Sequence, residues 1–196
     1  MLATEQTIIS LSSVIKQNIP AADLQWRQVS LTGEFDSGPI ILLDNQILNG
    51  VAGYNMIADF MVNGSDKRVL LNLGWIGAED NYGFIAPIQV PRGHLDLTGP
   101  LKMVEDNLFI DEIVFEGMKN NIIRVQEINI DEVGVTTGTK YHPFIILLGP
   151  EIEFGLHRDW QPIDSGPARH QAYVMQWFRM ALVVLVIFVG LIMKKS

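Results

Sequence analysis

The chain contains no cysteine and few basic residues. The lack of cysteine excludes disulfides, thiolate metal sites and thiol catalysis, but it suits the bacterial periplasm and the cytoplasm equally. Lysines and arginines number 14 against 22 aspartates and glutamates, which gives a formal net charge of -8. Nucleic-acid binding needs clustered basic residues to neutralise phosphate, so the composition argues against a nucleic-acid partner.

Catalytic motifs are missing as well. The sequence has neither the Gly-x-Ser-x-Gly pattern of a hydrolase elbow nor the Gly-Lys-Ser/Thr ending of a phosphate-binding loop. Acidic pairs such as Glu151 and Glu153 are available for acid–base catalysis, although solvated turns explain them more simply. His94, His142 and His157 have no partner at metal-ligand spacing. We therefore predict no catalytic residue, no metal site and no enzyme activity.

The end of the chain is strongly apolar. Met180–Met193 has no charged or polar side chain. A membrane span needs roughly 20 residues, and counting back to Tyr173 reaches that length while including Arg179. Aromatic residues such as Trp177 precede the run and two lysines follow it, as is usual at membrane interfaces. The alternative, a buried core helix, would show a polar stripe, so the pattern predicts a C-terminal transmembrane helix.

Before the apolar run, the hydrophobic period changes from helical to extended. In Glu5–Asn18, apolar residues such as Leu11 and Val14 recur at spacings of three and four, which predicts an amphipathic helix ended by Pro20. From Trp26 the period is two, and turn residues separate short apolar segments. A short helix is expected near Asp131–Val133. The expected strands are Val29–Phe35, Ile40–Leu43, Tyr54–Val62, Val69–Trp75, His94–Val104, Leu108–Phe115, Ile122–Val125 and Phe144–Leu148.

These patterns predict a mainly β fold, an antiparallel barrel- or sandwich-like domain with a short N-terminal helix and a C-terminal transmembrane helix. By residue number, the prediction is an N-terminal amphipathic helix at 1–20 and an extramembrane β-rich domain at 21–154. A connector follows at 155–166, and the transmembrane helix with its tail occupies 167–196.

The start of the last helix is the strongest candidate for a binding site. Pro167 suits the first helical position, and in an unbroken helix His170, Tyr173 and Trp177 fall at i, i+3 and i+7 on one face. With the hydrocarbon layer placed from about Val174 to Met193, His170 lies roughly one turn outside it. There its imidazole can offer a nitrogen to a lipid-dissolved metal cofactor such as haem. Its alternative role is to anchor the helix at the membrane interface.

The same segment carries a family resemblance. The segment Pro167–Phe178 is similar to the C-terminal signature of the Surfeit locus protein 1 family. The matching positions are Pro167, Arg169, His170, Tyr173, Gln176 and Trp177. The resemblance extends from Trp26 to the end of the chain. Further matching motifs, in the same order, are Trp26-Arg27, Gly33-x-Phe35, Leu43-Asp44-Asn45, Gly50, Gly53-Tyr54 and Val69–Trp75.

The family consists of inner-membrane assembly factors for haem–copper cytochrome c oxidase, to which haem binding is attributed. The resemblance therefore implies a membrane-anchored chaperone that helps haem insertion, with oxidase subunits and membrane lipid as partners. It implies transient haem binding by His170, with Tyr173 and Trp177 beside it. It also implies the bacterial inner (plasma) membrane as location, with the β-rich domain in the periplasm.

Two departures from the family pattern affect this interpretation. Leu73 stands where the family usually has arginine in an Asn-Arg-Gly-Trp motif. The family also has a first transmembrane helix, and this sequence has none before the β-rich domain. A lone C-terminal anchor would leave the domain in the cytoplasm, so we expect the true start to lie upstream of Met1.

Two other functions remain open at this stage. The chain can be an adaptor that docks the domain on oxidase subunits without binding haem, and replacing His170 would then have no effect. A membrane-tethered hydrolase would need an acid–base pair, for which Glu151 and Glu153 are the candidates to test. The sequence does not fix the oligomeric state.

Overall fold

The structure is a computed structural model that describes residues 7–17, 19–78, 90–104, 116–119, 121–160 and 167–195. The chain divides into two units, Met1–Trp160 and Gln161–Ser196. The described strands are β1 (Ile9–Ser10), β2 (Gln28–Phe35), β3 (Ile40–Leu48), β4 (Val51–Val62), β5 (Arg68–Gly77), β6 (Leu95–Met103), β7 (Glu116–Lys119), β8 (Ile122–Val125) and β9 (Tyr141–Leu147). The helices are α1 (Leu11–Gln17), α2 (Ala21–Leu24), α3 (Ile130–Thr137) and α4 (Pro167–Lys195).

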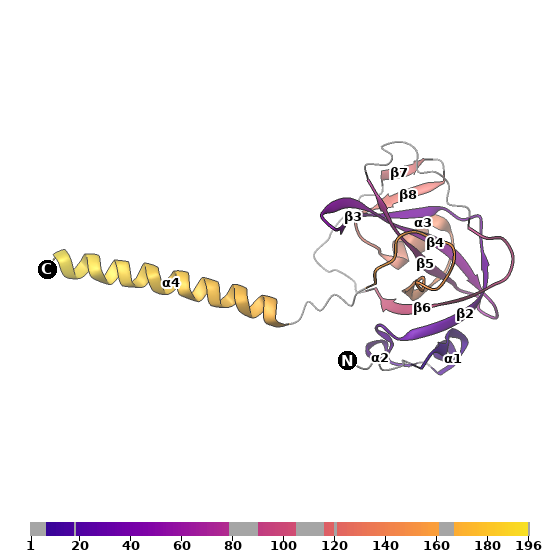
Figure 1. Cartoon of the computed structure of the whole chain (residues 1–196), viewed down its shortest axis with the longest axis horizontal. Coiled ribbons are helices and arrows are strands. Elements are labelled where there is room, and N and C mark those ends of the chain that lie inside the picture. The colour runs from indigo at the N-terminus through magenta and orange to yellow at the C-terminus, as the bar shows by residue number, and fades with distance from the viewer. Residues whose placement is uncertain are drawn as a thin grey trace. The chain divides into compact units, whose positions relative to one another are not determined.

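The described strands form one sheet that closes on itself as a barrel. Their order is β1-β2-β6-β9-β5-β4-β3-β8-β7, and an additional pairing joins β2 to β4. The closed ring therefore consists of β2, β6, β9, β5 and β4, while β3, β8 and β7 extend the sheet beyond β4. Figure 1 shows α1 and α2 beside β2, and β7 and β8 at the opposite edge. The prediction of a mainly β, barrel-like fold is confirmed.

The barrel closes where β2 crosses the second half of β4. Gly33 pairs with Val62, and Phe35 pairs with Phe60. A Cβ atom on Gly33 would collide with the backbone carbonyl oxygen of Met61, so only glycine lets the two strands approach this closely. The rings of Phe35 and Phe60 meet edge to face at 5.1 Å beneath this crossing. The Gly33-x-Phe35 motif thus has a structural purpose.

Alternation along the strands produces an inner and an outer apolar layer. Phe60, Leu71 and Ile146 belong to the buried cluster inside the barrel. On the other face of the same strands, residues such as Ile57 and Ile145 pack in a second cluster that also contains Val133 of α3. Strands buried on both faces explain why β4, β5 and β9 are apolar almost throughout.

The predicted N-terminal helix is shorter than expected. The sequence pattern places it over Glu5–Asn18, but the structure begins α1 at Leu11, because Ile9–Ser10 pair with β2 as a parallel strand. Leu11 and Val14 are buried as the spacing predicted, whereas Ile8 is exposed. The first residues of the predicted helix, 5 and 6, lie outside the described residues.

Of the other local predictions, a short helix is confirmed and one strand falls outside the described residues. The helix expected near Asp131–Val133 is α3, which Asn129 caps at its N-terminus and Gly138 ends in a left-handed conformation. The strand expected at Leu108–Phe115 lies outside the described residues. β7 and the four-residue α2 were not predicted.

A helix is present at the C-terminus, over Pro167–Lys195. Among the described residues, none of the four helices combines the length and apolar character of a membrane span, so the predicted transmembrane helix is not supported. The first residues of the predicted connector, up to Trp160, pack on the barrel, where the indole of Trp160 donates to the carbonyl oxygen of Leu148 at 2.7 Å. Residues 161–166 lie outside the described part of the chain.

Candidate functional site

The predicted binding residues lie at the start of α4. The helical backbone runs through His170, Tyr173 and Trp177, so their spacing places them on one helix face. The side chains of His170 and Tyr173 lie outside what the structure describes. Trp177 is 67% exposed, so its ring offers an open aromatic surface. The opposite face carries Arg179, whose side chain is also exposed.

A second candidate region lies in the barrel, where several of the family-like motifs come together around Trp75. The indole of Trp75 donates to the carbonyl oxygen of Gln46 at 2.8 Å. Its ring covers Gly53, where a Cβ atom would lie 2.5 Å from the indole. Glycine at this position therefore makes room for the tryptophan. The contact ties β5 to the hairpin formed by β3 and β4.

An arginine completes this region from β8. Arg124 donates from Nη2 and Nε to Oδ2 of Asp44 at 2.6 and 3.1 Å. Its guanidinium also lies 5.3 Å from the centroid of the Tyr54 ring, within the range of cation–π attraction. Asp44 precedes Asn45, which has a φ of 57° at an irregularity in the β3–β4 pairing. The motif residues Asp44 and Tyr54 are thus held by one cation.

The Asn-x-Gly-Trp motif forms a bulge on β5. The backbone NH of Gly74 donates to Oδ1 of Asn72 at 3.1 Å, and Gly74 has a φ of +123°, a conformation that favours glycine. Leu73, at the position where the family usually has arginine, is 0% exposed inside the barrel. Leucine therefore fills an apolar core position here and leaves no buried charge to neutralise.

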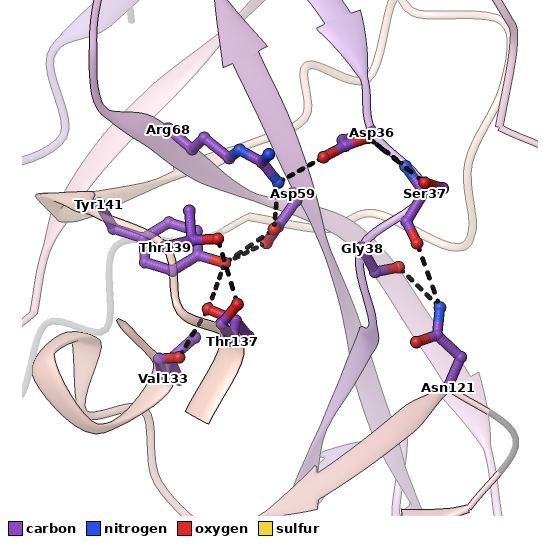
Figure 2. Close-up of polar contacts among 10 residues, drawn as sticks. All are labelled: Asp36, Ser37, Gly38, Asp59, Arg68, Asn121, Val133, Thr137, Thr139 and Tyr141. Atoms are coloured by element: carbon purple, nitrogen blue, oxygen red, sulfur yellow. Dashed lines mark hydrogen bonds and ion pairs between the residues drawn. The ribbon is translucent and has the colours of Figure 1, made fainter. Parts of the chain in front are cut away.

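A buried carboxylate forms the main polar cluster of the barrel wall (Figure 2). Asp59 is 2% exposed and accepts hydrogen bonds from the hydroxyl of Tyr141 at 2.7 Å and from Arg68 at 3.2 Å. Arg68 also pairs with Asp36 at 2.6 Å. The hydroxyl group of Tyr141 also lies 3.2 Å from the hydroxyl group of Thr137, the last residue of α3.

Burial controls protonation in this cluster. Loss of water raises the pKa of Asp59, although the hydrogen bonds from Tyr141 and Arg68 work in the opposite direction. Burial also raises the pKa of Tyr141, and the neighbouring carboxylate adds to the effect. A tyrosine that stays protonated can only donate to Asp59. The contacts therefore join β4, β5 and β9.

One hydroxyl–imidazole contact was not anticipated from the sequence. Oγ of Ser65 lies 2.9 Å from Nε2 of His142, whose ring stacks on Phe144. Burial lowers the pKa of His142, the charge of Lys67 lowers it further, and Asp66 opposes the shift. The same serine hydroxyl lies 2.9 Å from the carbonyl oxygen of Lys67 within its own turn. The contact thus fastens the turn between β4 and β5 to β9.

One member of the acidic pair considered for catalysis is hydrogen-bonded to the barrel. The carboxylate of Glu151 accepts a hydrogen bond from Thr98 of β6. Glu153 is exposed. Glu151 therefore has a structural contact at the surface of the barrel.

Comparison with known proteins establishes the family. Residues 3–182 match the model of the SURF1 family, and the chain belongs to that family. This confirms the resemblance inferred from the motifs. Uncharacterised SURF1-like proteins of Mycobacterium bovis and Mycobacterium tuberculosis are 26% identical to the chain over 165 residues. The alignment covers 83% of this chain and 58% of each relative, so the chain spans less than two thirds of their length.

Proposed function

We propose that this protein is a membrane-attached assembly factor for haem–copper cytochrome c oxidase that binds haem transiently at the start of α4. The observation that carries the proposal is the family match over residues 3–182, which includes His170, Tyr173 and Trp177. Haem is the cargo in this proposal, handed on to the catalytic subunit of the oxidase.

The arrangement at the start of α4 suits a flat, iron-containing ligand. His170 supplies the imidazole that iron prefers. One turn and two turns further along the same face, Tyr173 and Trp177 add aromatic side chains. Since the side chain of Trp177 is exposed, an apolar ring system can stack against its indole.

Membrane attachment through α4 is part of the proposal. Apolar side chains exposed along this helix include Phe178, Val184 and Leu191. Exposed apolar side chains of this kind cost free energy in water and are stabilised in lipid. We place the protein in the bacterial inner membrane with the barrel in the periplasm, as the family resemblance implies.

Haem titration of the full-length protein in lipid nanodiscs tests the proposal. The wild type is expected to give a Soret band that His170→Ala loses, because the imidazole ligand is removed. His94→Ala is the matched control, since His94 is an exposed histidine on the barrel. Circular dichroism and recovery in the membrane fraction should be equal for all three proteins.

The cellular measurement separates the proposal from its alternative. If haem is delivered through His170, cells carrying His170→Ala should assemble less haem-containing oxidase while retaining normal levels of the protein. An adaptor without haem binding predicts no Soret band in the wild type and full oxidase assembly with His170→Ala. That pair of results would refute the haem-binding role.

A further inference from the structure

A cavity of about 540 Å³ lies where α3 meets the starts of β5 and β9, and we call it the α3 cavity. Lys67, in the turn before β5, lines it together with Val135 of α3 and with Lys140 and Tyr141 at the start of β9. A volume of this size can hold a small organic molecule.

A close approach of the backbone shapes this cavity. A Cβ atom on Gly134 would lie 2.9 Å from the carbonyl oxygen of Thr139, so a side chain at 134 would push the following segment away from α3. The backbone NH of Thr139 instead donates to the carbonyl oxygen of Gly134 at 3.1 Å. The glycine therefore holds Thr139, and with it Lys140, close to the helix.

The two lysines of the lining are neighbours on adjacent strands. Arg68 pairs with Tyr141 in the parallel ladder of β5 and β9, and its backbone NH donates to the carbonyl oxygen of Lys140 at 2.8 Å. Lys67 and Lys140 each stand one residue before this pair, so they lie side by side where the two strands begin. Like charges in neighbouring positions of a sheet repel each other.

The two lysines are also unpaired in the described part of the chain. The cation between them in sequence, Arg68, is neutralised by Asp36 and Asp59. No described carboxylate forms an ion pair with Lys67 or Lys140. In a chain with 22 acidic and 14 basic residues, two unpaired ammonium groups at one cavity are a local concentration of positive charge. An anion between them would remove the repulsion.

The rest of the lining indicates what kind of anion fits. Val135 of α3 is 85% exposed, so an apolar group on the ligand can cover it. Among the described lining residues Asp131 is the only acidic one, and it lies in the first turn of α3, whereas the lysines lie near the other end. Seven residues of helix, about 10 Å, separate Asp131 from Gly138. A ligand with a second anionic group would therefore meet a carboxylate.

We propose that the α3 cavity binds a small organic anion, with its phosphate or carboxylate group on Lys67 and Lys140 and an uncharged apolar body over Val135. Binding neutralises the two neighbouring ammonium groups and removes apolar surface from water. The cavity lies in the first unit of the chain, so this proposal depends neither on haem binding by α4 nor on membrane attachment.

Isothermal titration calorimetry with phenyl phosphate tests the proposal. This probe combines a phosphate, which is a dianion at pH 8, with a compact apolar ring. The full-length protein in dodecyl maltoside should bind it, and Lys67→Met and Lys140→Met should each weaken binding by about fivefold. Lys16→Met is the matched control, because Lys16 is an exposed lysine of α1 that does not line the cavity. Circular dichroism should show the same fold for all variants.

Two further probes test the two ends of the ligand separately. Inorganic phosphate should bind more weakly than phenyl phosphate, because it leaves Val135 in water. 4-Carboxyphenyl phosphate should also bind more weakly, and Asp131→Asn should remove that difference. No binding of phenyl phosphate, or binding that both lysine variants leave unchanged, would refute the proposal. An equal loss with Lys16→Met would show a general attraction of anions and would refute it as well.

Discussion

At the residue scale, Asp59 shows how a charge is kept inside the barrel wall. A buried carboxylate loses its hydration, which raises its pKa and makes its ionised form costly. Tyr141 and Arg68 offset part of that cost by donating hydrogen bonds to it. Each donor comes from a different strand, so the carboxylate holds β4, β5 and β9 in one arrangement.

This arrangement predicts a pH dependence of stability. Because the folded pKa of Asp59 lies above its ordinary value of 3.8, the folded state binds the proton more tightly than the unfolded state. The wild type should therefore lose stability relative to Asp59→Asn as the pH rises from below 3.8 through the folded pKa. Urea unfolding of both proteins over this pH range measures the difference, and a constant difference would contradict the prediction.

At the element scale, the crossing of β2 and β4 decides whether the barrel closes. Gly33 lies against the backbone of Met61, which cannot move without breaking the pairing of the two strands. The ring of Phe35 fills the space below this point, against Phe60 and Phe154. A short motif thus fixes the contact between two strands that are distant in sequence.

Gly33→Ala should destabilise the protein by about 2 kcal/mol or more, because the added methyl group forces β2 and β4 apart. Thermal unfolding gives the change. The control is Gly64→Asn, at an exposed turn where nothing lies within 4 Å and where asparagine tolerates the positive φ of 76°. Equal effects of the two substitutions would show that close approach is not the cause.

Local signals in the sequence were sufficient for most elements. A period of two marked β2, turn residues around short apolar segments marked β4 and β5, and a short helix was expected near Asp131–Val133, where α3 lies. β1 could not be predicted, because two residues become a strand only by pairing with β2. The closure of the ring likewise depends on contacts between distant segments.

The polar clusters were only partly predictable. Asp59 interrupts an apolar stretch, which is a usable signal of a buried charge, but nothing in the sequence connects it to Tyr141, 82 positions away. The motifs around Asp44, Tyr54 and Trp75 could be identified by family resemblance. Their link through Arg124 appears only in the fold.

At the scale of the whole molecule, the family-like motifs fall into two groups. Those in the barrel, such as Gly33, Gly53 and Trp75, are engaged in contacts that build the fold. The motif around His170 lies in a helix of the second unit. Substitutions in the first group should lower the amount of folded protein, whereas His170→Ala should leave the barrel unchanged.

The length of β4 has a kinetic consequence. Its first half pairs with β3 and its second half closes the ring with β2, while β5 runs along nearly all of it. Neither part of the sheet can open by itself without exposing this strand. Hydrogen–deuterium exchange should therefore show the amides of Met56–Phe60 exchanging together, only through global unfolding. Faster exchange of one half would show that the ring and its extension are separate cooperative units.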